Sequence, residues 1–446
     1  MILIFILILS PILSLALTEE QIRTRVIQNF PLIEEAQNKL SSARADVVAA
    51  EGEFDHKLNF KSRNKIEDKY DNQFIETTLE RNTGVYGLGL IAGHRQGIGN
   101  FPAYDGKYET SGAGELFAGL SIPLLRNLST DQARTNLALE KINVKQAEVQ
   151  LRLKQNMYVH KALSLYYKWH LEERKIQIRK AILDLAQDRQ SMLEKRFKSG
   201  DIEKIKIVDN QRSIDKRKEE LLKSETDILY LKANLAIYLG DDVDLSGIHV
   251  VSDSSIGPPL HSVNQSLERS ELPQLKILNY ENEKAKLLEQ LYRQERLPGL
   301  GVDVIGAREL SGNQPFDPDN LQVALKFDFP LENRKAEGKT VSQEYKRLAV
   351  QKQIEYLDRE LKQNYNYLLK ALELSQNRWT TTSTEVVRSE TMAKAELTRW
   401  KEGSSDLFTV NLREQDVADV KIRKWSALYD YQQQLLDLKL YSDKLL

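Results

Sequence analysis

Cysteine is absent from this chain of 446 residues, which excludes disulfides, thiolate metal sites and thiol catalysis. Glycine and proline are scarce, with 21 and 11 residues, and low counts of both favour long uninterrupted helices over many tight turns. The formal net charge is only −1 and the mean hydropathy is −0.49. We therefore expect neither a polycationic surface for nucleic acid nor a bundle of membrane-spanning helices.

A long apolar run is found only at the N-terminus, over residues 1–17. Its length suits a secretory signal peptide better than a stable span, and Ser14-Leu15-Ala16 offers small residues for cleavage. The run contains no lysine or arginine, so a retained membrane anchor stays the alternative. Under either interpretation the rest of the chain leaves the cytoplasm.

A short motif of basic, aromatic and basic residues that ends in glycine occurs twice. Its copies are Arg196-Phe197-Lys198-Ser199-Gly200 and Arg399-Trp400-Lys401-Glu402-Gly403. Each copy follows a helical pattern of roughly seventy residues and precedes another of about forty. Glycine commonly ends helices because it enters the left-handed region at little cost. We therefore expect two helical hairpins, each with its tip at one of these glycines.

Apolar residues at helical spacing predict helices over residues 18–54, 129–199, 202–239, 335–402 and 405–441, and a further helix that opens at Leu272-Pro273. In the second of these, Leu137, Val144 and Leu151 lie seven residues apart, which is typical of coiled-coil packing.

Other stretches alternate with a period of two, which indicates strands over residues 58–66, 115–122, 300–304 and 321–329. The last is the clearest, because its odd-numbered positions are apolar and its even-numbered positions include Gln322, Lys326 and Asp328. Residues 68–111 are rich in glycine, asparagine and tyrosine, and we interpret them as a long exposed loop with some strand. The pattern thus predicts about four strands per chain.

The order of these segments repeats. Pro31 and Pro273 each open a helix, and Pro123-Leu124 and Pro330-Leu331 each follow a strand. We therefore expect a signal peptide at residues 1–17, a first repeat at 18–240, a connector at 241–270 and a second repeat at 271–446. Each repeat contains a helix, strands, a long helix, a tip and a returning helix.

The clearest strand carries an apolar face and a polar face. About nine such residues span a bilayer when the strand is tilted, with the apolar side chains towards lipid. A soluble sheet with one face on a core would alternate in the same way. Two observations favour the membrane: the export signal, and a number of strands too low for one chain to close a sheet by itself. Open sheet edges do not occur in lipid. Several chains would then have to close the barrel together.

This combination resembles the TolC-type outer-membrane efflux family, the outer membrane factors, over essentially the whole chain after residue 17. The residues that carry the resemblance are the two proline-initiated helices, the strand-to-Pro-Leu junctions at 121–126 and 327–331, and the two glycine tips. The resemblance implies a mainly α fold with a small β part and two internal repeats. In it, a trimeric twelve-stranded outer-membrane β-barrel continues into a long α-helical coiled-coil barrel.

The resemblance also implies a function and partners. The chain would form a homotrimer in the outer membrane of a diderm bacterium, with a long periplasmic extension. It would export substrates from a tripartite efflux pump or a type I secretion system. The implied partners are a periplasmic adaptor (membrane fusion) protein, an inner-membrane RND or ABC transporter and outer-membrane lipid. We expect no nucleic acid, cofactor or metal, and no enzyme activity, because no nucleophile–base grouping is readable.

The resemblance places adaptor docking at the two tips, on Arg196, Gly200, Arg399 and Gly403. The alternative is that both glycines only cap helices and that both arginines only favour a helix C-terminus. The alternation of the strand at 321–329 divides its residues between the lumen and lipid. Gln322, Lys326 and Asp328 would face the lumen, and lipid would contact Leu321, Val323, Leu325, Phe327 and Phe329.

Acidic residues near the tips are candidates for the periplasmic aperture, because three inward-facing copies of one acid would form a ring of like charge. The candidates are Asp201, Glu203 and Asp406. The family places its acidic gate nearly two turns beyond the second tip glycine, where this chain has Thr409. Asp406 therefore has a competing interpretation as a solvated acid at a helix start.

Two rival functions remain open. A coiled-coil scaffold of the cell envelope, held by an uncleaved N-terminal helix, would explain the heptads but neither the strands nor the duplicated order. A surface adhesin or receptor would use residues 68–111 as its exposed loop. The sequence does not identify the cargo, which could be a drug, a metal ion or a protein.

Overall fold

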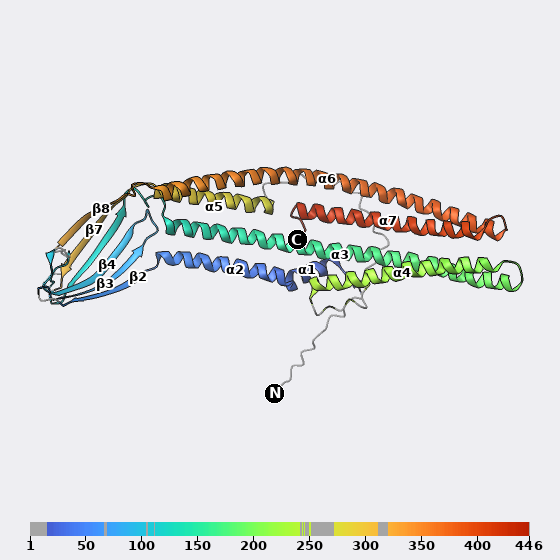
Figure 1. The fold of residues 1–446 in the computed structure, drawn as a ribbon, viewed down its shortest axis with the longest axis horizontal. Helices are drawn as coiled ribbons and strands as arrows, with labels where there is room; N and C mark the ends of the chain where they lie inside the picture. Colours follow the sequence, from blue (N-terminus) through green and yellow to red (C-terminus); the bar gives the residue numbers. More distant parts are fainter. Residues whose placement is uncertain are drawn as a thin grey trace, which may run out of the picture. The chain divides into compact units, whose positions relative to one another are not determined.

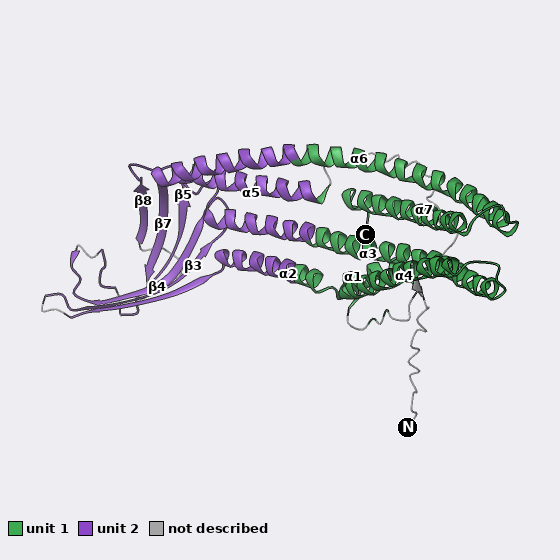
Figure 2. Cartoon of the chain, turned by 45° about the vertical axis from the view of Figure 1, so that its right-hand side comes forward, with its two compact units in different colours: residues 1–37, 151–273, 357–446 green, residues 38–150, 274–356 purple. Residues whose placement is uncertain are grey.

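The computed structural model describes residues 16–66, 69–103, 106–110, 112–240, 243, 245, 249–250, 272–310 and 320–445. Residues 1–15 of the predicted signal peptide and most of the predicted connector at 241–270 lie outside the described residues. The chain divides into two compact units (Figure 2). Unit 1 contains residues 1–37, 151–273 and 357–446, and unit 2 contains residues 38–150 and 274–356. Each unit therefore takes segments from both halves of the chain.

Unit 1 is helical (Figure 1). Its elements are β1 (Ala16–Leu17), α1 (Glu19–Asn29), the start of α2 (Pro31–Glu51), the second part of α3 (Gln132–Lys198), α4 (Lys204–Leu239), β6 (His249–Val250), the second part of α6 (Arg334–Lys401) and α7 (Leu407–Tyr441). The largest core cluster includes Ile22 and Val26 of α1, Val159 and Trp169 of α3, and Leu235 of α4, none of them more than marginally exposed. Two further clusters hold the rest of this unit: Leu368 and Leu372 of α6 pack with Tyr431 of α7, and Ala186 of α3 packs with Ile214 of α4.

The predicted helix over residues 18–54 is divided in two. Thr18 caps α1, with its hydroxyl accepting from the backbone N–H of Gln21 at 3.3 Å. Phe30 leaves the helix with φ −79° and ψ 119°, and Pro31 begins α2. Proline inside a helix lacks the N–H and clashes with the preceding turn, whereas it is well accommodated at the first helical position. The other long helices lie within a few residues of their predicted bounds.

Unit 2 contains the sheet (Figures 1 and 2). Its remaining elements are the rest of α2, the short 3₁₀ helix η1 (Gly52–Phe54), the first part of α3, nearly all of α5 (Pro273–Glu295) and the first part of α6. The strands are β2 (Lys57–Lys65), β3 (Asn72–Asn82), β4 (Gly89–Gly99), β5 (Glu115–Pro123), β7 (Gly299–Glu309) and β8 (Asn320–Asp328). Within the described residues, no helix is both long and apolar enough to cross a membrane.

All six strands form one sheet in the order β2-β3-β4-β5-β7-β8, and every neighbouring pair is antiparallel. The prediction of about four strands was wrong, because residues 68–111 supply β3 and β4 rather than mainly a loop. The helices all join the sheet at one end: η1 precedes β2, α5 precedes β7, and α3 and α6 follow β5 and β8. We call this the helix end of the sheet and the opposite end the distal end.

Candidate functional site

One face of the sheet is mainly apolar, although Arg81, His94, Gln96 and Arg308 also lie on it. Residues directly opposite each other in an antiparallel pair lie on the same face, so the register defines both faces across all six strands. Each strand contributes apolar side chains to one of them: Leu58 lies opposite Leu79, and Leu79 opposite Ala92. Two positions along β4 from Ala92, the row continues through Leu90, Leu120, Val304 and Val323. On the two edge strands, Leu58, Phe60, Leu321, Val323, Leu325 and Phe327 are each at least 64% exposed. In a single copy this face therefore does not cover a core.

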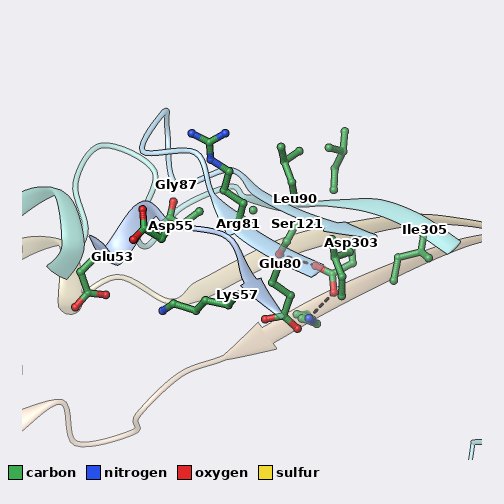
Figure 3. Close-up of a pocket in the computed structure, with 15 residues that line it drawn as sticks. Glu53, Asp55, Lys57, Glu80, Arg81, Gly87, Leu90, Ser121, Asp303 and Ile305 are labelled. Atoms are coloured by element: carbon green, nitrogen blue, oxygen red, sulfur yellow. Dashed lines mark hydrogen bonds and ion pairs between the residues drawn. The ribbon is translucent and has the colours of Figure 1, made fainter. Parts of the chain in front are cut away.

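The opposite face is polar and carries paired charges. The Ser121 hydroxyl donates to Asp303 Oδ1 at 2.8 Å, and Lys326 forms an ion pair with the same carboxylate. A cavity of about 460 Å³ lies near the helix end, lined by residues that include Lys57, Glu80, Asp303 and Lys326 (Figure 3). Its lining mixes acidic, basic and polar groups with the apolar residues Leu90, Ile91, Leu120 and Ile305, so it does not select one class of ligand.

The predicted alternation along β8 is present. Gln322, Lys326 and Asp328 lie opposite Ile305, Gly301 and Gly299 on the polar face. The predicted lipid-facing residues of the strand are on the apolar face, namely Leu321, Val323, Leu325 and Phe327. Phe329 follows the end of β8 and is 43% exposed. Which face meets lipid and which meets water stays a prediction.

The two helical tips in unit 1 have the same backbone geometry. Gly200 has φ +80° and Gly403 has φ +78°. At the first tip, the N–H of Gly200 donates to Phe197 O at 3.0 Å, and the N–H of Asp201 to Arg196 O at 2.9 Å. At the second tip, the N–H of Gly403 donates to Trp400 O and the N–H of Ser404 donates to Arg399 O. This is the Schellman arrangement, so both glycines act as helix caps as predicted; adaptor docking stays a prediction.

The two tip arginines differ in their surroundings. Arg399 forms an ion pair with Glu396 at 3.3 Å and donates to Ser404 O at 3.4 Å, so its side chain is held within its own tip. Arg196 is exposed in the last turn of α3. Both arginines are exposed to solvent, and Arg399 is in addition bonded within its own tip.

The acidic candidates near the tips are all exposed. Asp406 is the N-cap of α7, and its carboxylate accepts from the Thr409 N–H at 2.8 Å and the Thr409 hydroxyl at 3.2 Å. The backbone hydrogen bond is the main cause of the lowered pKa of Asp406, and Lys206 lowers it further. Asp201 accepts from the Ser199 hydroxyl at 3.0 Å, whereas Glu203 starts α4 without a side-chain cap. Asp406 thus serves as a helix-start acid, and its aperture role stays a prediction.

A buried charged cluster in unit 1 was not found from the sequence. Arg189 of α3 and Arg217 of α4 both form ion pairs with Glu414 of α7, the second at 3.4 Å. Arg189 also donates to Asn411 Oδ1 at 2.6 Å, and Arg217 to Ile182 O at 2.5 Å. The arginine side chains are only 4% and 3% exposed, and burial lowers the pKa of Arg217. We call these residues the arginine cluster.

Two histidines of α3 occupy different surroundings. His160 Nε2 lies 2.6 Å from Asp437 of α7. His170 is 8% exposed, its ring centre lies 6.1 Å from that of Trp425, and Arg174 also packs over that indole. Burial is the main cause that lowers the pKa of His170 to about 4, and the positive charge of Arg174 contributes. His170 is therefore a neutral core residue.

Comparison with known proteins identifies the fold. No protein-family model and no curated protein sequence matches the chain. Among solved structures, the outer-membrane channel OprN aligns with a TM-score of 0.70 and 10% identity, over 96% of this chain and 90% of OprN. The CmeC outer membrane channel of Campylobacter jejuni gives 0.67 and 10%, over 96% and 85%. The open state of the MtrE outer membrane channel of Neisseria gonorrhoeae gives 0.66 and 11%, over 96% and 89%.

The chain therefore has the TolC-type outer-membrane factor fold that the sequence resemblance predicted. It is mainly helical, with one small antiparallel sheet. The neighbours are outer-membrane channel proteins, and the absence of enzyme activity in this chain stays a prediction.

Proposed function

We propose that this chain is one subunit of a homotrimeric channel-tunnel that exports substrates through the outer membrane. The sheet with one exposed apolar face and one charged face carries this proposal. Lipid would contact the apolar face, and a water-filled lumen would contact the polar face. The similarity in fold to outer-membrane channels supports the same function.

The sheet edges support assembly from several copies. Within the described residues, β2 and β8 each pair with a neighbour on one side only. Unpaired strand edges do not occur in lipid. Because six alternating strands give β2 and β8 opposite directions, β8 of one copy can pair antiparallel with β2 of the next. Both edge strands also carry exposed apolar side chains on the same face of the sheet.

The strand count changes the expected barrel. The twelve-stranded barrel expected above requires four strands from each of three copies, and this chain has six in its sheet. Three copies of six strands make eighteen, so we propose an eighteen-stranded barrel. Barrels of about 16–18 strands enclose an aqueous channel.

The helical hairpins would form the periplasmic part of the tunnel. We propose that the tips at Arg196, Gly200, Arg399 and Gly403 dock a periplasmic adaptor, which connects the tunnel to an inner-membrane RND or ABC transporter. Asp201, Glu203 and Asp406 are exposed beside these tips and stay candidates for the aperture. Residues 1–17 would act as the export signal, and the two repeats at 18–240 and 271–446 would supply one hairpin each.

The experiment is reconstitution of the purified full-length protein. We expect native mass spectrometry to find trimers and planar bilayers to show discrete single-channel currents. Monomers that give no currents would refute the channel. A protein that fractionates with the inner membrane as an elongated rod would support the envelope scaffold instead.

A further inference from the structure

Residues 106–110, between β4 and β5, lie on the polar face of the sheet near its distal end. The backbone N–H of Thr110 donates to Gly97 O at 2.9 Å, and the N–H of Gly97 donates to the Thr110 hydroxyl at 3.0 Å. A Cβ added to Gly97, which lies on the polar face, would meet Tyr108 O at 2.4 Å. Thr110 therefore lies beside β4 beyond its pairing with β5, and the backbone at Tyr108 lies over the polar face of β4.

Side chains hold the segment in this position. The Tyr108 hydroxyl donates to Glu115 Oε1 at 2.7 Å and accepts from Arg95 Nη2 at 2.5 Å. Arg95 and Glu115 also form an ion pair, and Glu115 is fully buried. Lys107 Nζ lies 3.6 Å from the ring centre of Phe74 on β3. Arg95, Glu115 and Phe74 all belong to the polar face, so the segment is anchored over three strands.

Gly97 on β4 makes room for this second layer, and Gly93 makes room for the Phe117 ring beside it. A Cβ at Gly97 would clash with the backbone of Tyr108, and a Cβ at Gly93 would lie 2.7 Å from the Phe117 ring. Both glycines lie on the polar face, two positions on either side of Arg95. A backbone oxygen cannot move aside as a flexible side chain can, so the inward position of the segment depends on glycine at position 97.

We propose that residues 106–110 of each copy form a constriction inside the distal mouth of the channel. This inference rests on the proposed function, in which the polar face lines the lumen. The distal end is opposite to the helices, so it would be the outward mouth. An eighteen-stranded barrel would be wide, and three inward segments would narrow it where solutes leave. The segment would therefore set the conductance and the upper size of the solutes that pass.

The absence of cysteine from the chain allows a direct test. Glu109 is exposed between the anchoring residues Tyr108 and Thr110, so Glu109→Cys leaves the anchors in place. After the channel has inserted in a planar bilayer, a cationic methanethiosulfonate reagent is added. We expect the single-channel conductance to fall by about twofold or more, because each modified copy adds bulk and charge to a narrow ring.

Two control variants separate the constriction from the rest of the wall. Asn59→Cys lies on the polar face of β2 towards the helix end, and Ser62→Cys lies on the apolar face of the same strand. We expect modification to change the conductance little at position 59 and not at position 62. An unchanged conductance after modification of Glu109→Cys, in channels that otherwise conduct, would refute the constriction. Wild-type protein without channel activity would instead refute the proposed function, and the constriction with it.

Discussion

Glu414 of the arginine cluster provides the sharpest test of how the helical hairpins are held together. Its carboxylate is the ion-pair partner of both Arg189 and Arg217, whose side chains are almost completely buried. Glu414→Gln keeps the shape of the side chain and removes its charge. Removal of one partner of a buried ion pair costs about 3–5 kcal/mol, because an uncompensated charge remains. Asn411 and Ile182 still accept hydrogen bonds from the arginines, so we expect about 3 kcal/mol, the lower limit of that range.

Hydrogen exchange measured by mass spectrometry on the assembled protein tests this value locally. A cost of about 3 kcal/mol raises the opening equilibrium of the α7 segment about 100-fold. The matched control is Asp419→Asn, which removes an exposed acid from the same helix and should change exchange by less than about threefold. Equal exchange in the two variants would refute the ionic role of Glu414. The triple variant Arg189→Met/Arg217→Met/Glu414→Leu should be neutral or stabilising, because apolar replacement removes the buried charges together.

Three further predictions concern the sheet, a tip and a buried histidine. Leu325→Lys should cost about 2–4 kcal/mol in bilayer stability and reduce trimers in the outer membrane, whereas Gln322→Lys on the polar face should not; equal yields would contradict the assignment of faces. Gly403→Ala should destabilise its tip by about 1 kcal/mol, because Gly403 has a positive φ. Gly338→Ala should stabilise α6 by a similar amount, because Gly338 lies inside the helix with open space around it. Chemical denaturation of the two variants measures both changes. In the folded chain His170 has a pKa of about 4, against an ordinary value of 6.5. Between these two pH values the unfolded state binds more protons than the folded state. The free energy of unfolding should therefore fall by on the order of 3 kcal/mol as the pH drops from 6.5 towards 4. His170→Gln should remove this slope in melts followed against pH.

The strands were predicted where their residues alternate and missed where they do not. β8 alternates cleanly, and its bounds were found to within a residue. β4 instead has Gly89, Gly93 and Gly97 on its polar face. Glycine is unfavourable in strands because it loses more backbone entropy on folding and has no side chain to pack. In the folded chain Gly93 accommodates Phe117 and Gly97 accommodates the segment at 106–110, which no local pattern reveals.

The helical tips were predictable because a Schellman cap depends on a few consecutive residues. The arginine cluster was not, since its members come from helices far apart in the sequence. One sequence signal existed: Arg189 lies between the buried residues Ala186 and Leu193, and Arg217 follows Ile214 by three positions, so both charges occupy an apolar seam. A charge at a seam position indicates a buried partner, but the sequence does not identify which acid supplies it.

The open edges of the sheet have a consequence for biogenesis. In the proposed barrel, a lone chain would leave one edge of β2 and one edge of β8 unpaired, so its sheet would not be stable in the bilayer before other copies arrive. Insertion should then follow association, and its rate should rise steeply with protein concentration. Until that point the exposed apolar edges are liable to pair wrongly and aggregate. Each subunit of the proposed trimer would therefore need protection from aggregation until three have met.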